Sequence, residues 1–387
     1  MLKQFYDKDI FLSVIQKEDV RKWNLWNKNE NKKEIAENLS KNLRENKFKI
    51  EGLIKSCHNS KKTYYPKSPT DFFALKILDK YLRRIYQVKQ SDRKRIIRQI
   101  KTILKENGDF TLIRTDIKSF YETIDFNSIL GKIESDMILS PIGISLLKSL
   151  KQTFFYVAKI NKGLPRGINV SPTIAELYLR DFDISIKEDV DVIYYARYVD
   201  DIFLIVDDSK VNIIENEIKQ KIEKIHLEFN DDKIFKNSIK EEFSFSYLGY
   251  LFRLTSNNEV ELLISPKKIN KIKTRIYKSF LDYQHNNNFS LLLDRLRFLS
   301  CNKVRKKSEN GYLMAGNSYN YCDITDPNCF KVFDGFINKK ILNIFSLNDL
   351  QKNNIKKISF YRAYKNKINV SFTRRQIGNI KKAWGNE

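Results

Sequence analysis

Aspartates that end or separate apolar, strand-like segments constrain this chain more than any other feature. The segment 110–116 alternates apolar and polar residues and ends in an aspartate. Two further β-rich runs, 192–199 and 202–206, flank the pair Asp200-Asp201, which predicts a hairpin with a two-residue turn at the acid pair. Carboxylates fixed on adjacent strands of one rigid sheet meet the ligand demand of divalent cations.

The three acids Asp116, Asp200 and Asp201 suit nucleotidyl transfer. That reaction uses two hard cations about 4 Å apart, one at the attacking hydroxyl and one at the pyrophosphate leaving group. An Asp-Asp pair is also a common turn. The pair 207–208 illustrates this alternative, because it precedes Ser209 and a predicted helix, where the helix dipole favours acids.

The remaining pattern predicts an α+β chain with a strand-rich centre and helical ends. Residues 1–60 have a mostly helical and basic pattern, and the tail from about residue 286 is mixed and basic. A further strand is predicted over 243–252. Apolar residues at helical spacing predict helices over 71–86, 91–105 and 211–225, and from Pro266 onward.

The charge of the chain indicates a polyanionic partner. Lysine and arginine number 71 against 47 acids, which gives a net charge of +24 and favours nucleic acid or an acidic membrane surface. The basic residues are dispersed among the motifs, and no cationic helix with a broad apolar face dominates, so a peripheral membrane protein is disfavoured. No apolar run approaches the length of a membrane span.

The cysteines indicate a reducing compartment. Cys57, Cys301, Cys322 and Cys329 do not make a disulfide framework in a chain of 387 residues. A zinc site from the last three would fit no common ligand spacing. Charged residues interrupt the apolar N-terminus, so no secretory signal is predicted. We therefore expect a cytoplasmic protein.

Five motifs, in one order over about residues 110–250, resemble those of reverse transcriptases. They are Arg114–Tyr121 (RTDIKSFY), Gly163–Pro172 (GLPRGINVSP), Tyr198–Asp201 (YVDD), Leu227–Lys233 (LEFNDDK) and Tyr247–Gly249 (YLG). The resemblance implies a right-hand polymerase fold, with fingers, a palm built on an antiparallel sheet, and a helical thumb. It also implies an RNA-directed DNA polymerase that adds dNTPs to a primer end with two Mg²⁺ ions, Mn²⁺ being the alternative metal.

Within that family the chain is most similar to bacterial unknown-group, defence-associated reverse transcriptases. This likeness implies an antiphage role, a structured non-coding RNA as template, a DNA product, and either a second polymerase subunit or a homo-oligomer. It divides the chain into an N-terminal helical region and fingers (1–109), a palm (110–255, with part of the fingers at about 130–165), and a thumb with a basic C-terminal helical region (256–387).

The resemblance also assigns roles to the acids and their neighbours. Asp116 and Asp200 are expected to ligate both metal ions, and Asp201 to act as a weaker neighbour. Lys233 is expected to donate a proton to the departing pyrophosphate. Tyr121 is expected to pack under the sugar and to exclude a 2′-hydroxyl, which favours dNTPs over rNTPs.

Further residues are expected to contact the nucleotide, the template or the primer. Arg166, where many relatives have glutamine, adds a positive charge near the template or the incoming phosphate. Candidates for gripping the triphosphate are Arg83, Arg84 and Arg93. The expected template and primer contacts are Gly163, Pro165, Gly167, Tyr198, Tyr247, Leu248 and Gly249.

Three alternatives stay open at this stage. An RNA-dependent RNA polymerase is disfavoured by the aromatic residue at Tyr121. A retron or group II-like reverse transcriptase would share the same motifs. A non-catalytic RNA-binding scaffold is disfavoured because all three acids are present.

Overall fold

The chain forms two compact units, each built from two separate segments. The computed structural model describes residues 3–25, 31–58, 61–106, 108–239, 242–255, 257, 259–308, 311–342 and 347–385. One unit comprises Met1–Asp92 and Phe110–Lys236, and the other comprises Arg93–Asp109 and Asn237–Glu387. The segment after Asp92 therefore packs with the C-terminal part of the chain, although the sequence placed it with the fingers.

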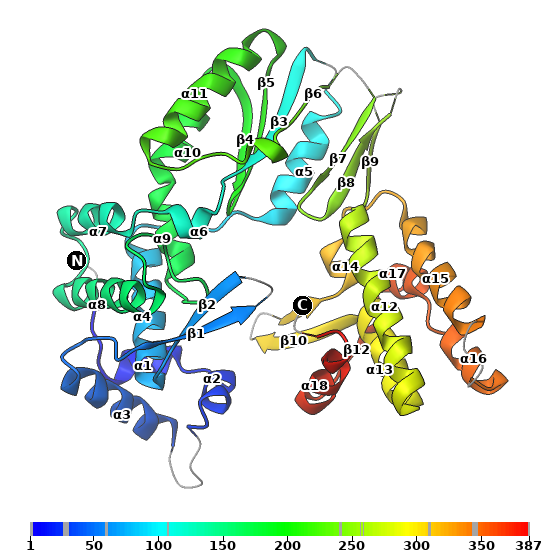
Figure 1. The fold of residues 1–387 in the computed structure, drawn as a ribbon, viewed down its shortest axis with the longest axis horizontal. Helices are drawn as coiled ribbons and strands as arrows, with labels where there is room; N and C mark the ends of the chain where they lie inside the picture. Colours follow the sequence, from blue (N-terminus) through cyan, green and yellow to red (C-terminus); the bar gives the residue numbers. More distant parts are fainter. Residues whose placement is uncertain are drawn as a thin grey trace. The chain divides into compact units, whose positions relative to one another are not determined.

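The first unit combines a helical part with a hairpin and a four-stranded sheet (Figure 1). Its helices are α1 (Lys8–Val14), α2 (Lys17–Lys22), α3 (Lys32–Glu45), α4 (Pro69–Ile85), α6 (Phe120–Thr123), α7 (Phe126–Ser135), α8 (Pro141–Ala158), α9 (Ser171–Tyr178), α10 (Arg180–Lys187) and α11 (Val211–Lys224), with the short 3₁₀ turns η1 (Asp208–Lys210) and η2 (Asp231–Lys233). Its strands are β1 (Leu53–His58), β2 (Lys61–Pro66), β3 (Phe110–Asp116), β4 (Val192–Tyr198), β5 (Asp201–Asp207) and β6 (Phe235–Ser238), which extends past the boundary of the unit.

The four-stranded sheet has the order β4-β5-β3-β6, and β5 pairs antiparallel with both β3 and β4. Residues Ile202 to Val206 of β5 are all buried, as expected for an apolar strand between two neighbours. Helices α10 and α11 lie against this sheet (Figure 1), and α11 buries Ile214, Ile218 and Ile222. The strand patterns of the sequence are thus confirmed.

One local prediction needs correction in the first unit, and one hairpin was not predicted. The turn between β4 and β5 is Val199-Asp200, one residue earlier than predicted, because Asp201 already pairs with Tyr198. The N-terminal region is not only helical, since β1 and β2 form an antiparallel hairpin. Lysines and serines interrupt the apolar residues of β1, which hides its alternation in the sequence.

The second unit begins with α5 (Arg93–Ile103) and contains two three-stranded sheets, β7-β8-β9 and β11-β10-β12. Its strands are β7 (Phe243–Tyr247), β8 (Tyr250–Leu254), β9 (Val260–Ile264), β10 (Asn302–Ser308), β11 (Gly311–Ala315) and β12 (Asn369–Val370). Its other helices are α12 (Pro266–Asn286), α13 (Phe289–Ser300), α14 (Asn317–Asn320), η3 (Pro327–Phe330), α15 (Lys331–Leu342), α16 (Asp349–Lys356), α17 (Phe360–Lys365) and α18 (Arg374–Lys382).

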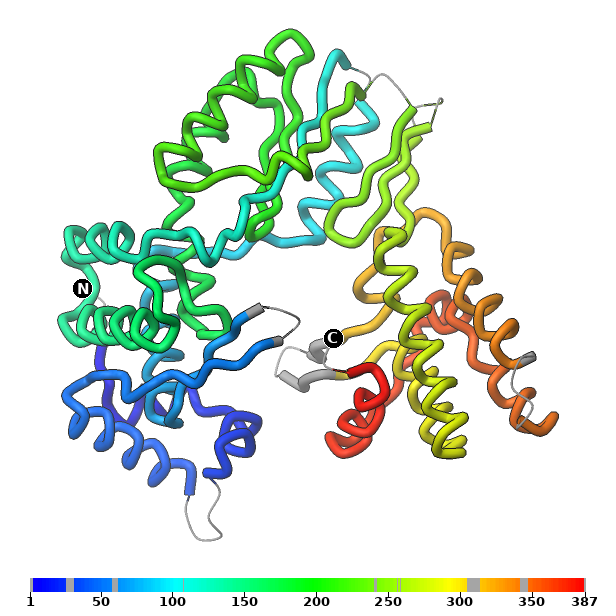
Figure 2. Tube along the Cα trace, in the orientation of Figure 1, coloured from blue at the N-terminus to red at the C-terminus, as the bar shows by residue number. Residues whose placement is uncertain are grey.

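The segment 243–252, predicted as one strand, is a hairpin in the structure. β7 ends at Tyr247 and β8 begins at Tyr250, with Leu248 (φ +45°) and Gly249 (φ +86°) in the turn. The apolar residues around Gly249 conceal this turn in the sequence. Elsewhere in the second unit, α18 packs on α13 (Figure 2). Across the described ranges, no helix combines the length and the apolar content needed to cross a membrane.

Candidate active site

The structure brings the predicted acids together at one end of the palm sheet. Asp116 is the last residue of β3, and its Cα partner across the ladder is Asp201, the first residue of β5. The backbone N–H of Ile117 donates to the carbonyl of Asp200 at 3.0 Å. The two acid segments, distant in the sequence, are therefore direct neighbours, as the resemblance to reverse transcriptases implied.

The two carboxylate oxygens of Asp116 differ in their hydrogen bonding. Lys233 Nζ lies 2.6 Å from Asp116 Oδ2, whereas Asp116 Oδ1 is buried and accepts no hydrogen bond from any described residue. A buried acceptor without a donor costs about 1–3 kcal/mol, so such an oxygen in a native fold calls for an explanation. A cation ligated by Asp116 would provide one.

The three carboxylates also share one electrostatic field. Burial raises the pKa of Asp201; the nearby guanidinium of Arg114, 3.3 Å away, opposes this shift, and the charges of Asp200 and Asp116 add to it. Among the described residues, no set of three or more His, Cys, Asp or Glu side chains forms a ready-made metal site. The donors still fit Mg²⁺, which usually takes one or two protein carboxylates and completes its shell with water and phosphate.

A buried arginine network lies behind the Val199-Asp200 turn. Arg197 donates to Asp183 and Glu176, with Nη2 at 2.6 Å and 2.7 Å from their carboxylates. Its Nη1 also donates to the carbonyl of Val199 at 2.8 Å. Burial opposes the positive charge, but Asp183 and Glu176 outweigh it and raise the pKa of Arg197.

The sequence analysis did not assign a role to Arg197, which directly precedes the Tyr198–Asp201 motif. The available signal was a charged residue inside an otherwise apolar strand. The partners Glu176 and Asp183 lie on α9 and α10 and could not be identified from spacing alone. Val199 has φ +62°, an unfavourable conformation for a β-branched residue, and Arg197 holds its carbonyl.

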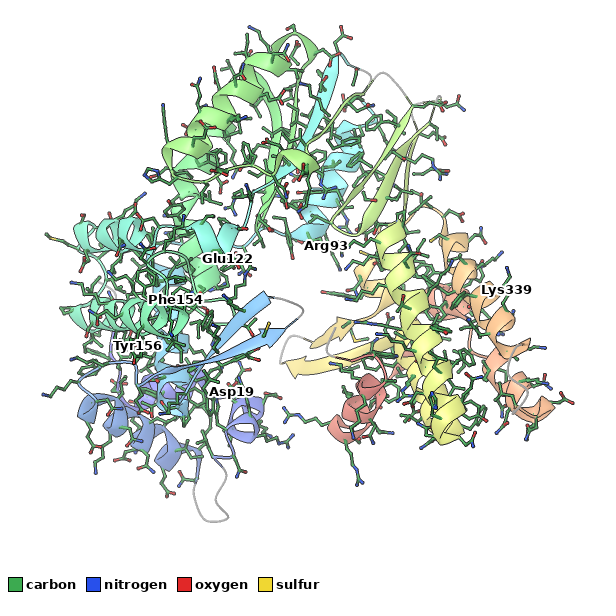
Figure 3. The ribbon with its side chains drawn as sticks, viewed as in Figure 1. Asp19, Arg93, Glu122, Phe154, Tyr156 and Lys339 are labelled. Carbon is green, nitrogen blue, oxygen red and sulfur yellow. The ribbon has the colours of Figure 1, made fainter. Side chains whose placement is uncertain are left out.

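Tyr121 and Arg166, both predicted to contact the nucleotide, lie together. Tyr121 is half-buried on α6, and the Arg166 guanidinium lies 4.8 Å from the centre of its ring. Arg166 also pairs with Glu122, a residue that the sequence analysis did not select and that Figure 3 labels beside α6. The charge of Asp200 acts on both Tyr121 and Arg166, which places the pair near the acids.

The glycine-rich loop needs its glycines for close approach to the chain's own backbone. Gly163 (φ +99°) and Gly167 (φ +95°) both adopt the left-handed region. A Cβ at Gly167 would lie 2.7 Å from the carbonyl oxygen of Tyr64, and one at Gly163 would lie 3.0 Å from that of Glu122. The carbonyl of Pro165 accepts a hydrogen bond from the Ser171 hydroxyl at 2.8 Å, so the loop is also fixed to the start of α9.

The three arginines proposed to grip a triphosphate are divided between the two units, with Arg83 and Arg84 in the first and Arg93 in the second. Arg83 donates to Asp79 at 2.9 Å and 3.1 Å, and Asp79 accepts from Thr173 of α9. Arg84 is exposed, and its charge acts on Tyr81. The contacts of Arg83 therefore lie in the helical part of the first unit.

Arg93 belongs to the second unit and contacts the predicted primer-holding turn. Its Nε donates to the carbonyl of Leu248 at 2.8 Å, and its Nη1 donates to the carbonyl of Asn320 at 2.8 Å. The guanidinium lies 4.9 Å from the ring centre of Tyr250 and 5.8 Å from that of Tyr321. Figure 3 labels Arg93 at the start of α5. The structure thus gives Arg93 a place beside the primer turn.

Comparison with known proteins identifies the central part of the chain. Residues 71–252 match the family model described as reverse transcriptase (RNA-dependent DNA polymerase). These residues form a reverse transcriptase domain. The enzyme class of this domain is RNA-directed DNA polymerase, a nucleotidyltransferase, and such domains use divalent metal ions. A search of curated proteins returned no match to the sequence.

Solved structures of telomerases show a distant likeness to the chain. Apo telomerase from Candida tropicalis, truncated from its C-terminal domain, is 13% identical with a TM-score of 0.36, over 49% of this chain and 44% of that one. Telomerase from Candida albicans with a TWJ fragment of telomeric RNA is 11% identical with a TM-score of 0.36, over 81% and 56%. Apo telomerase from Candida tropicalis is 12% identical with a TM-score of 0.39, over 80% and 52%. The chain thus spans about half the length of these structures, and scores this low support no inference about its function.

The reverse transcriptase domain confirms the predicted fold class. Its antiparallel sheet carries Asp116 at the end of β3 and Asp201 at the start of β5, with Asp200 in the adjoining turn, which is the expected palm of a right-hand polymerase. The fourth member of the predicted catalytic set, Lys233, is the last residue of η2. Tyr198, the last residue of β4, pairs directly with Asp201.

A cavity of about 560 Å³ lies beside the glycine-rich loop of the reverse transcriptase domain. Tyr64 and Phe154, whose rings meet edge to face at 4.9 Å, contribute aromatic walls. Lys62, Lys159 and Lys162 also line it. Aromatic walls with lysines around them are the features by which proteins hold single-stranded nucleic acid without reading its sequence.

Proposed function

We propose that the whole chain is an RNA-directed DNA polymerase that adds dNTPs to a primer end on an RNA template. The observation that carries this proposal is the convergence of Asp116 with the Asp200-Asp201 segment, together with the buried Asp116 oxygen that accepts no hydrogen bond from any described residue. Two carboxylates on adjacent strands, one of them with an open ligand position, match what two-metal nucleotidyl transfer requires.

Asp116 and Asp200 would hold two Mg²⁺ ions, and Mn²⁺ is the alternative metal. Bound Mg²⁺ supplies charge neutralisation at the phosphates and a more acidic primer hydroxyl. The sheet register fixes the acids, so little reorganisation is needed when substrate binds. Lys233, whose Nζ lies 2.6 Å from Asp116 Oδ2, would give its Nζ proton to the departing pyrophosphate. General acid catalysis of this kind contributes about 10²–10⁴-fold.

Tyr121 would act as the sugar gate of this polymerase. A half-buried aromatic ring within the field of Asp200 would leave no room for a 2′-hydroxyl on the incoming nucleotide. This assignment favours a DNA product over an RNA product. It also favours a reverse transcriptase over the RNA polymerase alternative.

The nucleic acid would be held at two further places. The turn at Leu248-Gly249, with Tyr247 before it, would hold the primer end. The cavity formed by Tyr64, Phe154 and the lysines around them would hold an unpaired template nucleotide. The net charge of +24 provides the general attraction to phosphate.

Primer extension with acid-to-amide variants tests the polymerase proposal. We expect Asp116→Asn and Asp200→Asn to reduce extension of a DNA primer on an RNA template with dNTPs and Mg²⁺ by at least about 10³-fold, because charge neutralisation and positioning supply nearly all of this catalysis. Asp207→Asn is the matched control, since Asp207 lies on β5 and its side chain caps η1, a task that asparagine also performs. A loss below tenfold in Asp200→Asn would refute the assignment.

We further propose that the chain serves bacterial antiphage defence with a structured non-coding RNA as its template. The motif resemblance to defence-associated reverse transcriptases supports this role. The test is to purify the protein from its host and to sequence the co-purified RNA and any attached DNA. One dominant RNA with complementary DNA is expected, and a random RNA mixture would contradict the proposal. The mass of the same preparation would distinguish a homo-oligomer from a complex with a second polymerase subunit.

A further inference from the structure

The segment that carries the sugar gate is hydrogen-bonded along the glycine-rich loop. The backbone N–H of Leu164 donates to the carbonyl of Tyr121 at 2.7 Å, and the N–H of Gly163 donates to the carbonyl of Ile124 at 2.8 Å. The Tyr121 segment and the loop are therefore joined through their main chains. Main-chain bonds fix the backbone of Tyr121 but leave the orientation of its ring to the side chains around it.

The side chain of Arg166 lies against that ring, and Glu122 pairs with Arg166. Arg166 donates from Nε to Glu122 Oε1 at 2.8 Å and from Nη2 to Glu122 Oε2 at 2.9 Å, which is a bidentate pair. The same guanidinium lies 4.8 Å from the centre of the Tyr121 ring. The ring of Phe120 lies 5.6 Å away in an edge-to-face arrangement. Tyr121 is thus held between an aromatic edge and an arginine whose plane is set by Glu122.

Arg166 is itself anchored to the N-terminal hairpin. Its carbonyl accepts a hydrogen bond from the backbone N–H of Tyr64 at 2.7 Å, and Tyr64 belongs to β2. Glu122, in contrast, has a side chain that is 53% exposed. An ion pair at that exposure contributes little to fold stability. Its bidentate geometry, however, fixes the orientation of the guanidinium much more strictly than a single charge contact would.

We propose that the Glu122–Arg166 pair is a specificity-determining positioning device, which fixes the Tyr121 ring and thereby sets how strongly the enzyme rejects ribonucleotides. This inference rests on the proposed function, because it presumes that Tyr121 faces the sugar of the incoming nucleotide. It extends that function by placing the control of sugar selection in a contact between the glycine-rich loop and α6. One member of the pair is Arg166, which stands where many relatives have glutamine.

The test measures kcat/KM for dCTP and for CTP on one primer–template, in the full chain carrying Glu122→Gln or Arg166→Lys. Both changes break the bidentate pair, so we expect each to lower the dCTP preference about tenfold. We expect the double variant to show the same loss as either single variant, because the two residues act as one unit. Arg166→Lys retains the positive charge, so an unchanged preference in that variant would overturn the role of the pair.

Two further variants separate this inference from the proposed function. Tyr121→Ala removes the gate itself and should lower the dCTP preference more than either pair variant. If Tyr121→Ala lowers the preference while Glu122→Gln leaves it within twofold, the gate stands and the inference is wrong. If Tyr121→Ala leaves the preference unchanged, the gate assignment itself fails. Asp181→Asn breaks an exposed ion pair with Lys132 in the same unit and should leave the preference unchanged.

Discussion

Two hairpin turns, one in each unit, place a non-glycine residue at positive φ and hold its carbonyl with an arginine. In the β4–β5 turn, Val199 (φ +62°) accepts from Arg197 at 2.8 Å. In the β7–β8 turn, Leu248 (φ +45°) accepts from Arg93 at 2.8 Å. The first turn carries the proposed catalytic acid Asp200, and the second is the proposed primer-holding turn. The same local arrangement, an arginine that donates to the carbonyl of a turn residue at positive φ, thus occurs in two turns with different proposed roles.

The two arginines differ in how their charge is compensated. Arg197 comes from the hairpin itself, is 4% exposed, and pairs with Glu176 and Asp183. Arg93 comes from a helix 155 residues earlier in the chain, is partly exposed, and lies over the rings of Tyr250 and Tyr321. Loss of Arg197 would leave two carboxylates without their cation, whereas loss of Arg93 would leave two aromatic rings and two neutral carbonyl groups. We therefore expect the first turn to depend on its arginine for folding and the second to depend on it for binding.

The largest effect is expected for Arg197→Gln, which removes the buried guanidinium that pairs with the half-buried carboxylates of Glu176 and Asp183. Removing one partner from a buried charge network costs about 3–5 kcal/mol. Chemical denaturation of the full chain should show this loss in the free energy of unfolding. Adding Asp183→Asn removes one of the stranded charges and should recover part of the loss. A destabilisation below about 1 kcal/mol by Arg197→Gln would break the contrast between the two turns.

A smaller effect, on binding instead of folding, is expected for Arg93→Gln. Losing the contacts to Leu248 and to the two tyrosine rings should raise KM for the primer–template about tenfold, equivalent to about 1.4 kcal/mol. The KM for dNTP should change less than twofold. Arg95→Gln, at an exposed position of the same helix, is the control. A raised KM for dNTP with an unchanged primer KM would instead favour the triphosphate contact that the sequence suggested.

The smallest effect on stability is expected for Val199→Gly. Glycine relieves a left-handed strain of about 1–2 kcal/mol, but it adds about 0.5–1 kcal/mol of backbone entropy to the unfolded chain. The free energy of unfolding should therefore change by less than about 1 kcal/mol. In the Arg197→Gln background, however, Val199→Gly should restore primer extension several-fold without restoring stability. Absence of this rescue would show that Arg197 does not act by holding the turn.

Local pattern was sufficient to predict the elements that carry the acids. The alternation in 110–116 and the apolar run 202–206 correspond to β3 and β5, because alternation is typical of a half-buried strand and a short apolar run is typical of a fully buried one. The pair 207–208 was also interpreted correctly, since Asp207 accepts from the Ser209 N–H and caps η1. The sequence was less informative at hairpins, where Leu248 and Gly249 lie within an apolar run.

The tertiary structure decided which charged side chains meet. The sequence did not indicate that Arg93 donates to a carbonyl 155 residues away, a contact that packing sets. It left Glu122 without a role, although that carboxylate pairs with an arginine 44 residues away. Periodicity along the chain indicates which residues are buried and whether they lie in a helix or a strand. The burial pattern and the type of element both depend on residues that are near neighbours in the sequence. The partner of a long charged side chain depends on distances across the fold, and only the packed structure sets those.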